Sequence, residues 1–378
     1  MSRFKLIEEL ELKRVVIKIG SSLLADPAQQ NGLNPHTLKM LVSEISALRN
    51  QGIAVLLVSS GAVTTGRHII QKQFGRSPRT EPGLARRQAL SAIGQSPLIA
   101  ALSAAFKAVA IPVAQILITA HDLHQRRSYL NIGHTLHELM ELGALPIINE
   151  NDTVATDELQ FGENDLLSAA CAALFDAQLL IILTSVDGFL LNGKRIAEIK
   201  QITSDLRKAA GGPAGPGSGG MQTKLRAGEL CQLSGQSLAI LPGRHPSPVS
   251  ALLAGQDIGT VIHTRGQAVQ VRARKKWLLF VQTQGAVCID DGALEALQNQ
   301  GSSLLPGGIA AVPADFYAGE VIAILDGQGQ IVGRGISNYS SRELRLILEQ
   351  RSTAAAQKIF RHRDEVIHRD NLVMEIRL

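Results

Sequence analysis

Six short, almost continuously apolar runs constrain the fold of this chain more than any other feature. They are Val15–Gly20, Ala54–Ser60, Val113–Thr119, Leu145–Asn149, Leu179–Thr184 and Ser237–Leu241. A strand that is apolar on both faces belongs inside a sheet that is covered on both sides. Helix-forming segments separate the runs, at about 36–50, 86–108, 127–142, 163–175 and 221–234. This alternation predicts an α/β fold, with a mostly parallel sheet sandwiched by helices.

The pattern changes near residue 265, and a chain of 378 residues is long for one domain. Beyond this point the candidate strands are short, at Trp277–Val281, Ala286–Ile289, Val321–Leu325 and Gln330–Gly333. Candidate turns are Asp291-Gly292, Pro306-Gly307-Gly308 and Asp326-Gly327. We therefore predict a first domain over 1–264 and a small, mainly β C-terminal domain over 272–365, with a helical tail from about 341.

Composition excludes several classes of protein. Cys171, Cys231 and Cys288 are scattered, which favours a reducing, cytoplasmic location over a disulfide framework or a zinc site. The longest apolar run, Ala108–Ala120, is too short to span a membrane. Two histidine pairs at i, i+3 spacing lie on a charged helical pattern, so we expect a solvated or interface face and no metal site. The net charge of +5 suits an anionic ligand.

Two lysines that are distant in sequence stand beside glycine-rich turns. Lys18 lies inside the first apolar run, and Lys224 follows the glycine-rich stretch 209–220. A charge in a buried strand is costly without a partner, so Lys18 either pairs with a carboxylate or serves a site. The stretch 209–220 is either a flexible linker or a mobile loop over a ligand. Together the two lysines predict a site that grips a phosphate group from both sides.

Polar residues follow the other apolar runs. Ser60 stands at a tight turn, where its hydroxyl could bind an anion or cap the next helix. Amides and carboxylates recur in 149–152 and again at Asn164 and Asp165. Helix capping alone would explain the second pair, whereas a carboxylate between two lysines would keep both oriented and charged. The chain has no Gly-x-x-x-x-Gly-Lys-Ser/Thr motif, so it is not a P-loop protein.

Taken in order, these segments resemble the glutamate 5-kinases of proline biosynthesis, within the amino acid kinase superfamily. The matching blocks are Val16–Ser22, Val58–Ala62, Ala92–Gln95, Ile147–Asp152, Gly162–Ala169 and Gly219–Lys224. Three later blocks, Gly301–Ile309, Gly319–Val321 and Gly335–Ser341, resemble the PUA domain that many bacterial members carry. The resemblance covers about residues 14–370.

This resemblance implies transfer of the γ-phosphoryl group of ATP to the side-chain carboxylate of L-glutamate, with Mg²⁺ held mainly through ATP phosphates and water. It implies catalytic roles for Lys18, Lys224 and Asp165. It implies glutamate binding by Ser60, Asp152 and Asn164. It implies nucleotide contacts for Lys18, Thr184, Ser185, Ser218, Gly219, Gly220, Met221, Gln222, Thr223 and Lys224. The chain departs from the family at Ser185, where an aspartate is usual, and in the short segment Val186–Lys194.

The resemblance also bears on partners. It implies a homo-oligomer (a dimer or a tetramer), feedback inhibition by proline near Asp157 and Glu158, and hand-off of the product to glutamate-5-semialdehyde dehydrogenase. Rival interpretations are another amino acid kinase, acting on aspartate, acetylglutamate, carbamate or a phosphorylated small molecule, and a degenerate kinase scaffold. An RNA-binding role for the PUA-like domain is disfavoured, because residues 265–378 hold 14 Lys and Arg against 12 Asp and Glu. No membrane partner is expected.

Overall fold

The structure is a computed structural model, which describes residues 11–29, 32–75, 83–155, 164–211, 220–264, 273–349 and 365–374. The chain divides into two compact units, Met1–Val269 and Gln270–Leu378.

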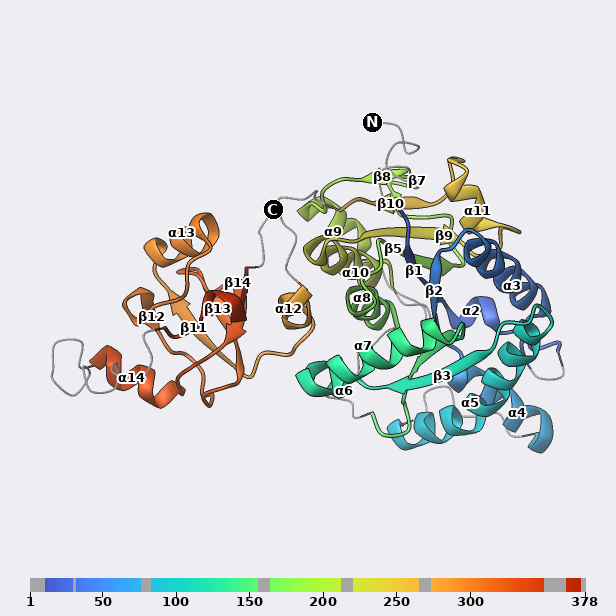
Figure 1. Cartoon of the computed structure of the whole chain (residues 1–378), viewed down its shortest axis with the longest axis horizontal. Helices are drawn as coiled ribbons and strands as arrows, with labels where there is room; N and C mark the ends of the chain where they lie inside the picture. The colour runs from blue at the N-terminus through green and yellow to red at the C-terminus, as the bar shows by residue number, and fades with distance from the viewer. Residues whose placement is uncertain are drawn as a thin grey trace. The chain divides into compact units, whose positions relative to one another are not determined.

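The first unit is built on an eight-stranded sheet with the strand order β3-β4-β2-β1-β5-β9-β10-β8 (Figure 1). The strands are β1 Arg14–Ile19, β2 Ala54–Ser59, β3 Val113–Ile118, β4 Leu145–Glu150, β5 Leu179–Thr184, β8 Glu198–Ile199, β9 Ser237–Pro242 and β10 Thr260–Ile262. All neighbouring strands are parallel except β9 and β10. A separate hairpin joins β6 Leu190–Leu191 to β7 Lys194–Arg195. The six strands predicted from the sequence are confirmed, as is the mostly parallel sheet.

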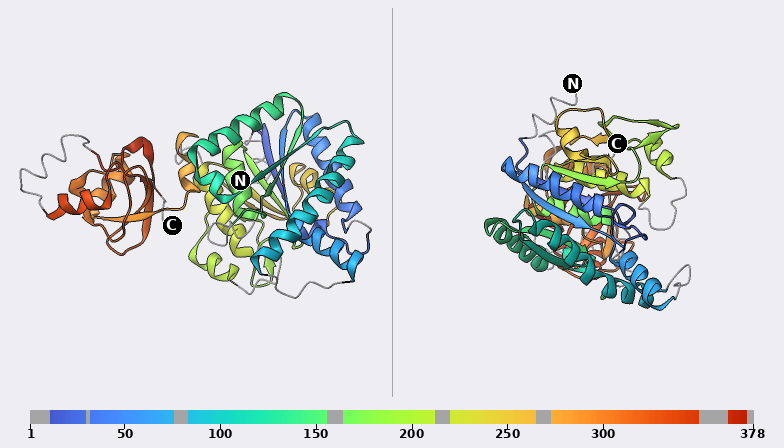
Figure 2. Two further views of the ribbon diagram at one scale, coloured as in Figure 1. Left: turned by 90° about the horizontal axis from the view of Figure 1, so that it is seen from below. Right: turned by 90° about the vertical axis from the view of Figure 1, so that its right-hand side faces the viewer.

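Helices cover both faces of this sheet (Figure 2). The helices of this unit are α2 Ser21–Leu24, α3 Pro35–Asn50, α4 Ala62–Phe74, α5 Leu84–Lys107, α6 Ala120–His124, α7 Arg126–Glu141, α8 Asn164–Leu174, α9 Ser204–Ala210, α10 Met221–Ser234 and α11 Pro248–Leu253. All five predicted helices are present. Helix α4, which lies between two of them, was not expected from the sequence, and neither were the shorter helices α2, α6, α9 and α11.

Strand alternation decides which way the lysine of β1 faces. Val15, Ile17 and Ile19 belong to a core that they share with apolar residues of α3, α5 and α11. Since successive side chains of a strand point to opposite faces, Lys18 lies on the other face, the one covered by α8 and α10.

The carboxyl end of β1 lies at a change of direction in the sheet. β1 pairs with β2 on one side and with β5 on the other, both in parallel register. Chain connections therefore leave these strands toward opposite sides, which opens a crevice at their carboxyl ends. The loops that begin at Gly20, Ser60 and Ser185 all start at this edge.

Helices α4 and α5 cross with their backbones in contact, and two glycines allow it. A methyl group on Gly94 would lie 1.9 Å from the carbonyl oxygen of Ala62, and one on Gly66 would lie 1.9 Å from that of Leu90. Any larger side chain would push the helices apart. The crossing fixes α5 relative to the start of α4, directly after Ser60.

Helix α5 is also long and apolar enough to cross a membrane, judged by length and composition alone. Its residues Leu98, Leu102 and Phe106 pack in the core beneath the sheet. Core helices of soluble proteins share this composition, so one such helix is weak grounds for a membrane span.

The second unit holds a five-stranded sheet with the order β12-β11-β13-β14-β15, in which only β11 and β13 are parallel. The strands are β11 Gly285–Ile289, β12 Ile309–Ala311, β13 Val321–Leu325, β14 Ile331–Ile336 and β15 Leu372–Met374. The helices are α12 Ala273–Lys276, α13 Asp291–Gln300 and α14 Ser341–Glu349, with 3₁₀ turns at Trp277–Leu279, Pro306–Gly308 and Arg369–Asn371. A small, mainly β unit with a helix from residue 341 agrees with the prediction.

Two predictions in this unit are wrong. The expected strand Trp277–Val281 is instead a 3₁₀ turn over Trp277–Leu279 that continues directly from α12. Its residues are buried, and a short apolar run alone does not distinguish a buried strand from a buried helical turn. The expected turn at Asp291-Gly292 is the first turn of α13, because the Asp290 carboxylate accepts a hydrogen bond from the Ala293 N–H and caps that helix.

Candidate active site

A buried carboxylate joins the two lysines. Lys18 Nζ lies 2.7 Å from Asp165 Oδ1, and Lys224 Nζ lies 3.0 Å from Asp165 Oδ2. Asp165 is fully buried, and the lysines are only 6% and 4% exposed. The three groups come from β1, α8 and α10, more than 200 residues apart at the extremes. The structure thus brings together the three residues for which catalytic roles were predicted.

The electrostatic balance of this triad leaves a positive charge. Burial alone would raise the pKa of Asp165, but the charges of Lys18 and Lys224 and their hydrogen bonds outweigh it and hold the pKa below its ordinary value. Asp165 is therefore ionised at neutral pH. Two ammonium groups and one carboxylate sum to a net charge of +1 in a site closed to solvent, and an anion would complete it.

Two helices begin at this triad. Asp165 lies in the first turn of α8, and Lys224 lies in the first turn of α10, whose N-cap is Gly220. The Thr223 hydroxyl donates a hydrogen bond to Asp165 Oδ2 over 3.1 Å, which ties the two helix starts together. The positive ends of both helix dipoles add to the surplus charge. Such an arrangement suits a phosphate group.

The residues predicted to contact a nucleotide lie on two sides of this triad. Thr184 ends β5, next to β1, and its carbonyl oxygen accepts a hydrogen bond from the Gly243 N–H over 2.8 Å. Ser185 follows as an exposed residue. Gly220 to Lys224 form the start of α10, whereas Ser218 and Gly219 lie outside the described residues.

Ser60 and Asn164 form a second polar group beside the triad. The Asn164 side-chain amide donates to Ser60 Oγ over 2.6 Å and to the Ser59 carbonyl oxygen over 3.3 Å. The alternative role of Ser60 as a helix cap is not realised, since Gly61, with φ of 107°, is the N-cap of α4 and no side chain caps it. Because Asn164 directly precedes Asp165, this pair lies next to the carboxylate that holds the two lysines.

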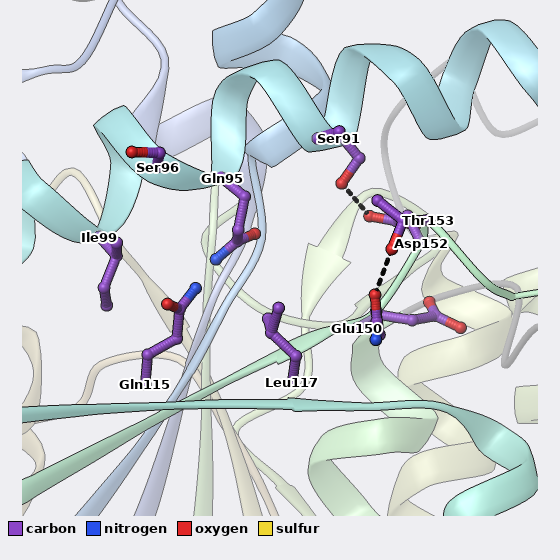
Figure 3. A pocket seen from close by; sticks show the side chains of 11 residues that line it. Ser91, Gln95, Ser96, Ile99, Gln115, Leu117, Glu150, Asp152 and Thr153 are labelled. Carbon is purple, nitrogen blue, oxygen red and sulfur yellow. Dashed lines mark hydrogen bonds between the residues drawn. The ribbon is translucent and has the colours of Figure 1, made fainter.

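The loop after β4 supplies Asp152, one strand further along the edge. The Ser91 hydroxyl donates a hydrogen bond of 2.8 Å to Asp152 Oδ2 (Figure 3). Burial raises the pKa of Asp152 above its usual value, against the opposing effects of that hydrogen bond and of the Arg87 charge. A cavity of about 350 Å³ lies here, and its polar lining includes Ser91, Gln95, Glu150 and Asp152 (Figure 3).

Sequence reasoning missed the residues of α5 that hold this loop. Gln95 Oε1 accepts a hydrogen bond of 2.8 Å from the Asn149 side chain, and Gln88 Nε2 donates one of 3.0 Å to the Ala155 carbonyl oxygen. Gln95 belongs to a block that carried the family resemblance, but serine and glutamine on a helix usually face solvent. Their signal is periodicity, which places 88, 91 and 95 on one helical face.

Asp157 and Glu158, where proline control was expected, lie outside the described residues. Across the described ranges, no cluster of three or more His, Cys, Asp or Glu side chains could hold a metal ion. Cys171, Cys231 and Cys288 are free cysteines.

Comparison with known families agrees with this architecture. The model of the amino acid kinase family matches residues 13–241, and that of the PUA domain matches residues 285–359. The fold and the paired-lysine site thus define an amino acid kinase with an appended PUA domain.

Full-length relatives narrow this class. A glutamate 5-kinase of Citrifermentans bemidjiense is 40% identical over 374 residues, covering 96% of this chain and 98% of the relative. One from Thermus thermophilus is 38% identical over 376 residues, covering 97% of this chain and 98% of the relative. The chain belongs to the glutamate 5-kinase family.

Solved structures similar to this chain are more distant. The carbamate kinase of Giardia lamblia bound to AMP-PNP has a TM-score of 0.49 and 20% identity, over 68% of this chain and 99% of that one. A UMP kinase from Bacillus anthracis has a TM-score of 0.46 and 17% identity, over 67% and 97% of the two chains.

Proposed function

We propose that this protein transfers the γ-phosphoryl group of ATP to the side-chain carboxylate of L-glutamate and forms glutamyl 5-phosphate, the first step of proline biosynthesis. The observation that carries this proposal is the buried triad, in which Asp165 holds Lys18 and Lys224 at 2.7 and 3.0 Å and leaves one positive charge in surplus. Family membership supports the choice of glutamate as the acceptor.

The reaction requires no covalent catalysis by the protein. A γ-carboxylate oxygen of glutamate attacks the γ-phosphorus, the bond from that phosphorus to the β,γ-bridging oxygen breaks, and ADP leaves with the electron pair. The carboxylate is already ionised at neutral pH, so no general base is needed. Catalysis then depends on alignment and on stabilising charge as the phosphoryl group moves. Lys18 and Lys224 supply that charge, and Asp165 fixes where both ammonium groups point.

Acceptor binding is assigned to Ser60, Asn164 and Asp152. Ser60 and Asn164 offer hydrogen-bonding groups that suit a carboxylate beside the phosphoryl site. Asp152 is the charged member of this set, and the only cation on glutamate is its α-ammonium group. We therefore pair Asp152 with that ammonium group, which fits a half-buried carboxylate that lacks a lysine or arginine within ion-pair distance among the described residues.

ATP would lie between β5 and the start of α10, against Thr184, Ser185 and the segment from Ser218 to Lys224. Mg²⁺ would accompany the phosphates, because both oxygens of Asp165 are occupied by lysines and the described residues offer no carboxylate cluster. A cytoplasmic location fits an enzyme that uses ATP and carries free cysteines. We also propose a homo-oligomer, proline inhibition and hand-off of the labile product to the dehydrogenase, on the family resemblance alone.

The test is an acyl phosphate trap. Purified protein is incubated with ATP, Mg²⁺ and hydroxylamine, and hydroxamate is measured with glutamate, aspartate or N-acetylglutamate as the acceptor. We expect hydroxamate with glutamate and little with the other two acids. Turnover of aspartate or N-acetylglutamate in place of glutamate would reject the substrate, and no turnover of any acid would favour a degenerate scaffold.

A further inference from the structure

Helix α5 carries one continuous stripe of inward-facing residues whose character changes along its length. Residues 88, 91, 95, 98, 102 and 106 follow one another at spacings of three or four, so they share a helical face. Leu98, Leu102 and Phe106 pack into the core under the sheet. Where the same face reaches the carboxyl edge of the sheet, it becomes polar, as Gln88, Ser91 and Gln95.

Each polar member of this stripe binds either the end of β4 or the segment that follows it. Gln95 contacts Asn149, Ser91 contacts Asp152 and Gln88 contacts the Ala155 carbonyl oxygen, over 2.8, 2.8 and 3.0 Å. Ser91 is only 2% exposed, so its hydroxyl does not belong to a solvated helix surface. The Ser91 hydroxyl donates to a carboxylate from a buried position, on a helical face that becomes apolar two turns later at Leu98, so this contact is a specific arrangement.

The stripe is also fixed relative to Ser60. The α4–α5 crossing at Gly66 and Gly94 brings the backbones of the two helices together, and α4 starts directly after Ser60. One pair of helices therefore sets the positions of both Ser60 and Asp152.

From this geometry we infer that Ser91 is a positioning residue, which holds one oxygen of Asp152 so that the other faces the amino group of the acceptor. The inference rests on the proposed function, since it takes Asp152 as the group that binds the glutamate ammonium. It assigns to α5, an element outside the phosphoryl site, control over the discrimination between an amino acid and a plain dicarboxylic acid.

The pKa of Asp152 provides a test of the role of Ser91 that is independent of KM. The Ser91 hydroxyl stabilises the ionised carboxylate, and so does the charge of Arg87 on the same helix, while burial opposes ionisation. Glu150, at the end of β4, is the other acidic group of the same cavity. Removal of the Ser91 hydroxyl should raise the pKa of Asp152 further, so a larger fraction of the enzyme carries a neutral Asp152 at a given acidic pH.

The experiment compares Ser91→Ala with Ser91→Thr and Ser91→Cys in the full chain. For Ser91→Ala we expect KM for glutamate to rise about tenfold, with kcat and KM for ATP within about twofold of the wild type, because the lost hydrogen bond is to a charged group that only binds the acceptor. The acid limb of kcat/KM for glutamate should move to higher pH. Ser91→Thr, which keeps the hydroxyl, should restore both values, and Ser91→Cys, which keeps the volume with a weaker donor, should fall between.

Glutarate is the discriminating acceptor, because it has both carboxylates of glutamate and no amino group. The ratio of kcat/KM for glutamate to that for glutarate should fall in Ser91→Ala and in Asp152→Asn alike. Ser103→Ala, an exposed serine of the same helix, is the matched control and should leave every value unchanged.

Two failures are distinguishable. If Asp152→Asn raises KM for glutamate but Ser91→Ala matches the wild type in KM and in pH profile, the positioning role of Ser91 is wrong and the proposed function survives. If Asp152→Asn leaves KM for glutamate and the glutarate ratio unchanged, Asp152 does not bind the ammonium group, and both assignments are wrong. If Ser91→Ala raises KM for glutamate and also lowers kcat, and Ser91→Thr restores neither value, the role of the serine is purely structural. That outcome would also overturn the inference.

Discussion

Removal of the Lys224 ammonium group tests the surplus charge of the triad directly. In the wild type, the two lysines and Asp165 sum to +1; in Lys224→Ala, Lys18 and Asp165 remain paired at 2.7 Å and sum to zero. The transferring phosphoryl group then loses one unit charge from its surroundings. At an effective dielectric constant of about 20, a unit charge about 4 Å from another contributes about 4 kcal/mol.

That magnitude agrees with the cost of losing one charge-stabilising donor, about 2.7–4 kcal/mol, or about 10²–10³ in kcat. We expect a decrease of that size in hydroxamate formation at saturating ATP and glutamate. KM for glutamate should change little, because the acceptor residues lie directly after β2, shortly after β4 and at the start of α8 rather than on α10.

Two further variants separate charge from packing. Lys224→Met retains an apolar stem of similar length and should lose as much activity as Lys224→Ala. Arg226→Ala removes a positive charge two residues along α10, from a side chain that is 46% exposed and paired with Glu229, and should change kcat by less than about twofold. A folded Lys224→Met protein with kcat within about fivefold of the wild type would refute the charge argument.

Three other changes have defined outcomes. Asp165→Asn leaves two ammonium groups without their carboxylate and should cost about 3–5 kcal/mol of unfolding free energy at pH 7, measured with urea. The pKa of Asp165 is lowered in the folded protein, so its carboxylate stabilises the fold above the ordinary pKa, and this stabilisation is lost as pH falls through the folded value. The unfolding free energy of Asp165→Asn should not show this loss in acid. Gly94→Ala should lower the free energy of unfolding by about 1–3 kcal/mol, because the added methyl group meets a backbone carbonyl oxygen. Gly83→Ala, where the methyl group has open space, should not lower it. Equal melting temperatures of the two variants would exclude the tight crossing of α4 and α5. A chain that ends at residue 264 should retain hydroxamate formation, and its failure to fold would show that the first unit needs the second.

The sheet and the triad could be predicted from the sequence, since both depend on patterns that few structures satisfy. Apolar runs that are bounded by glycine and serine and alternate with helical segments favour buried parallel strands, and a lysine such as Lys18 inside one needs a nearby carboxylate. The convergence of Lys18, Asp165 and Lys224 follows because each stands at a strand end or helix start of the same edge.

Other features depend on packing that no local pattern encodes. The role of Ser91 depends on a helix crossing set by Gly66 and Gly94, which lie in different helices. The run Trp277–Val281 is apolar enough for a strand, but α12 precedes it and carries the backbone on into a helical turn. Helix α13 was missed because Asp290 caps a segment that also has the composition of a turn.

Asp165 has two roles that activity measurements on it alone would confuse. Lys18 and Lys224 could not remain buried and charged without its carboxylate, so α8 and α10 dock on β1 in one arrangement, and the site forms as the unit folds. Loss of activity in Asp165→Asn would therefore follow from a displaced lysine as readily as from a missing catalytic charge. Lys224 differs, because its removal leaves Asp165 paired with Lys18. Lys224, rather than the residue at the centre of the triad, is therefore the position where a lost catalytic charge can be distinguished from a disturbed structure.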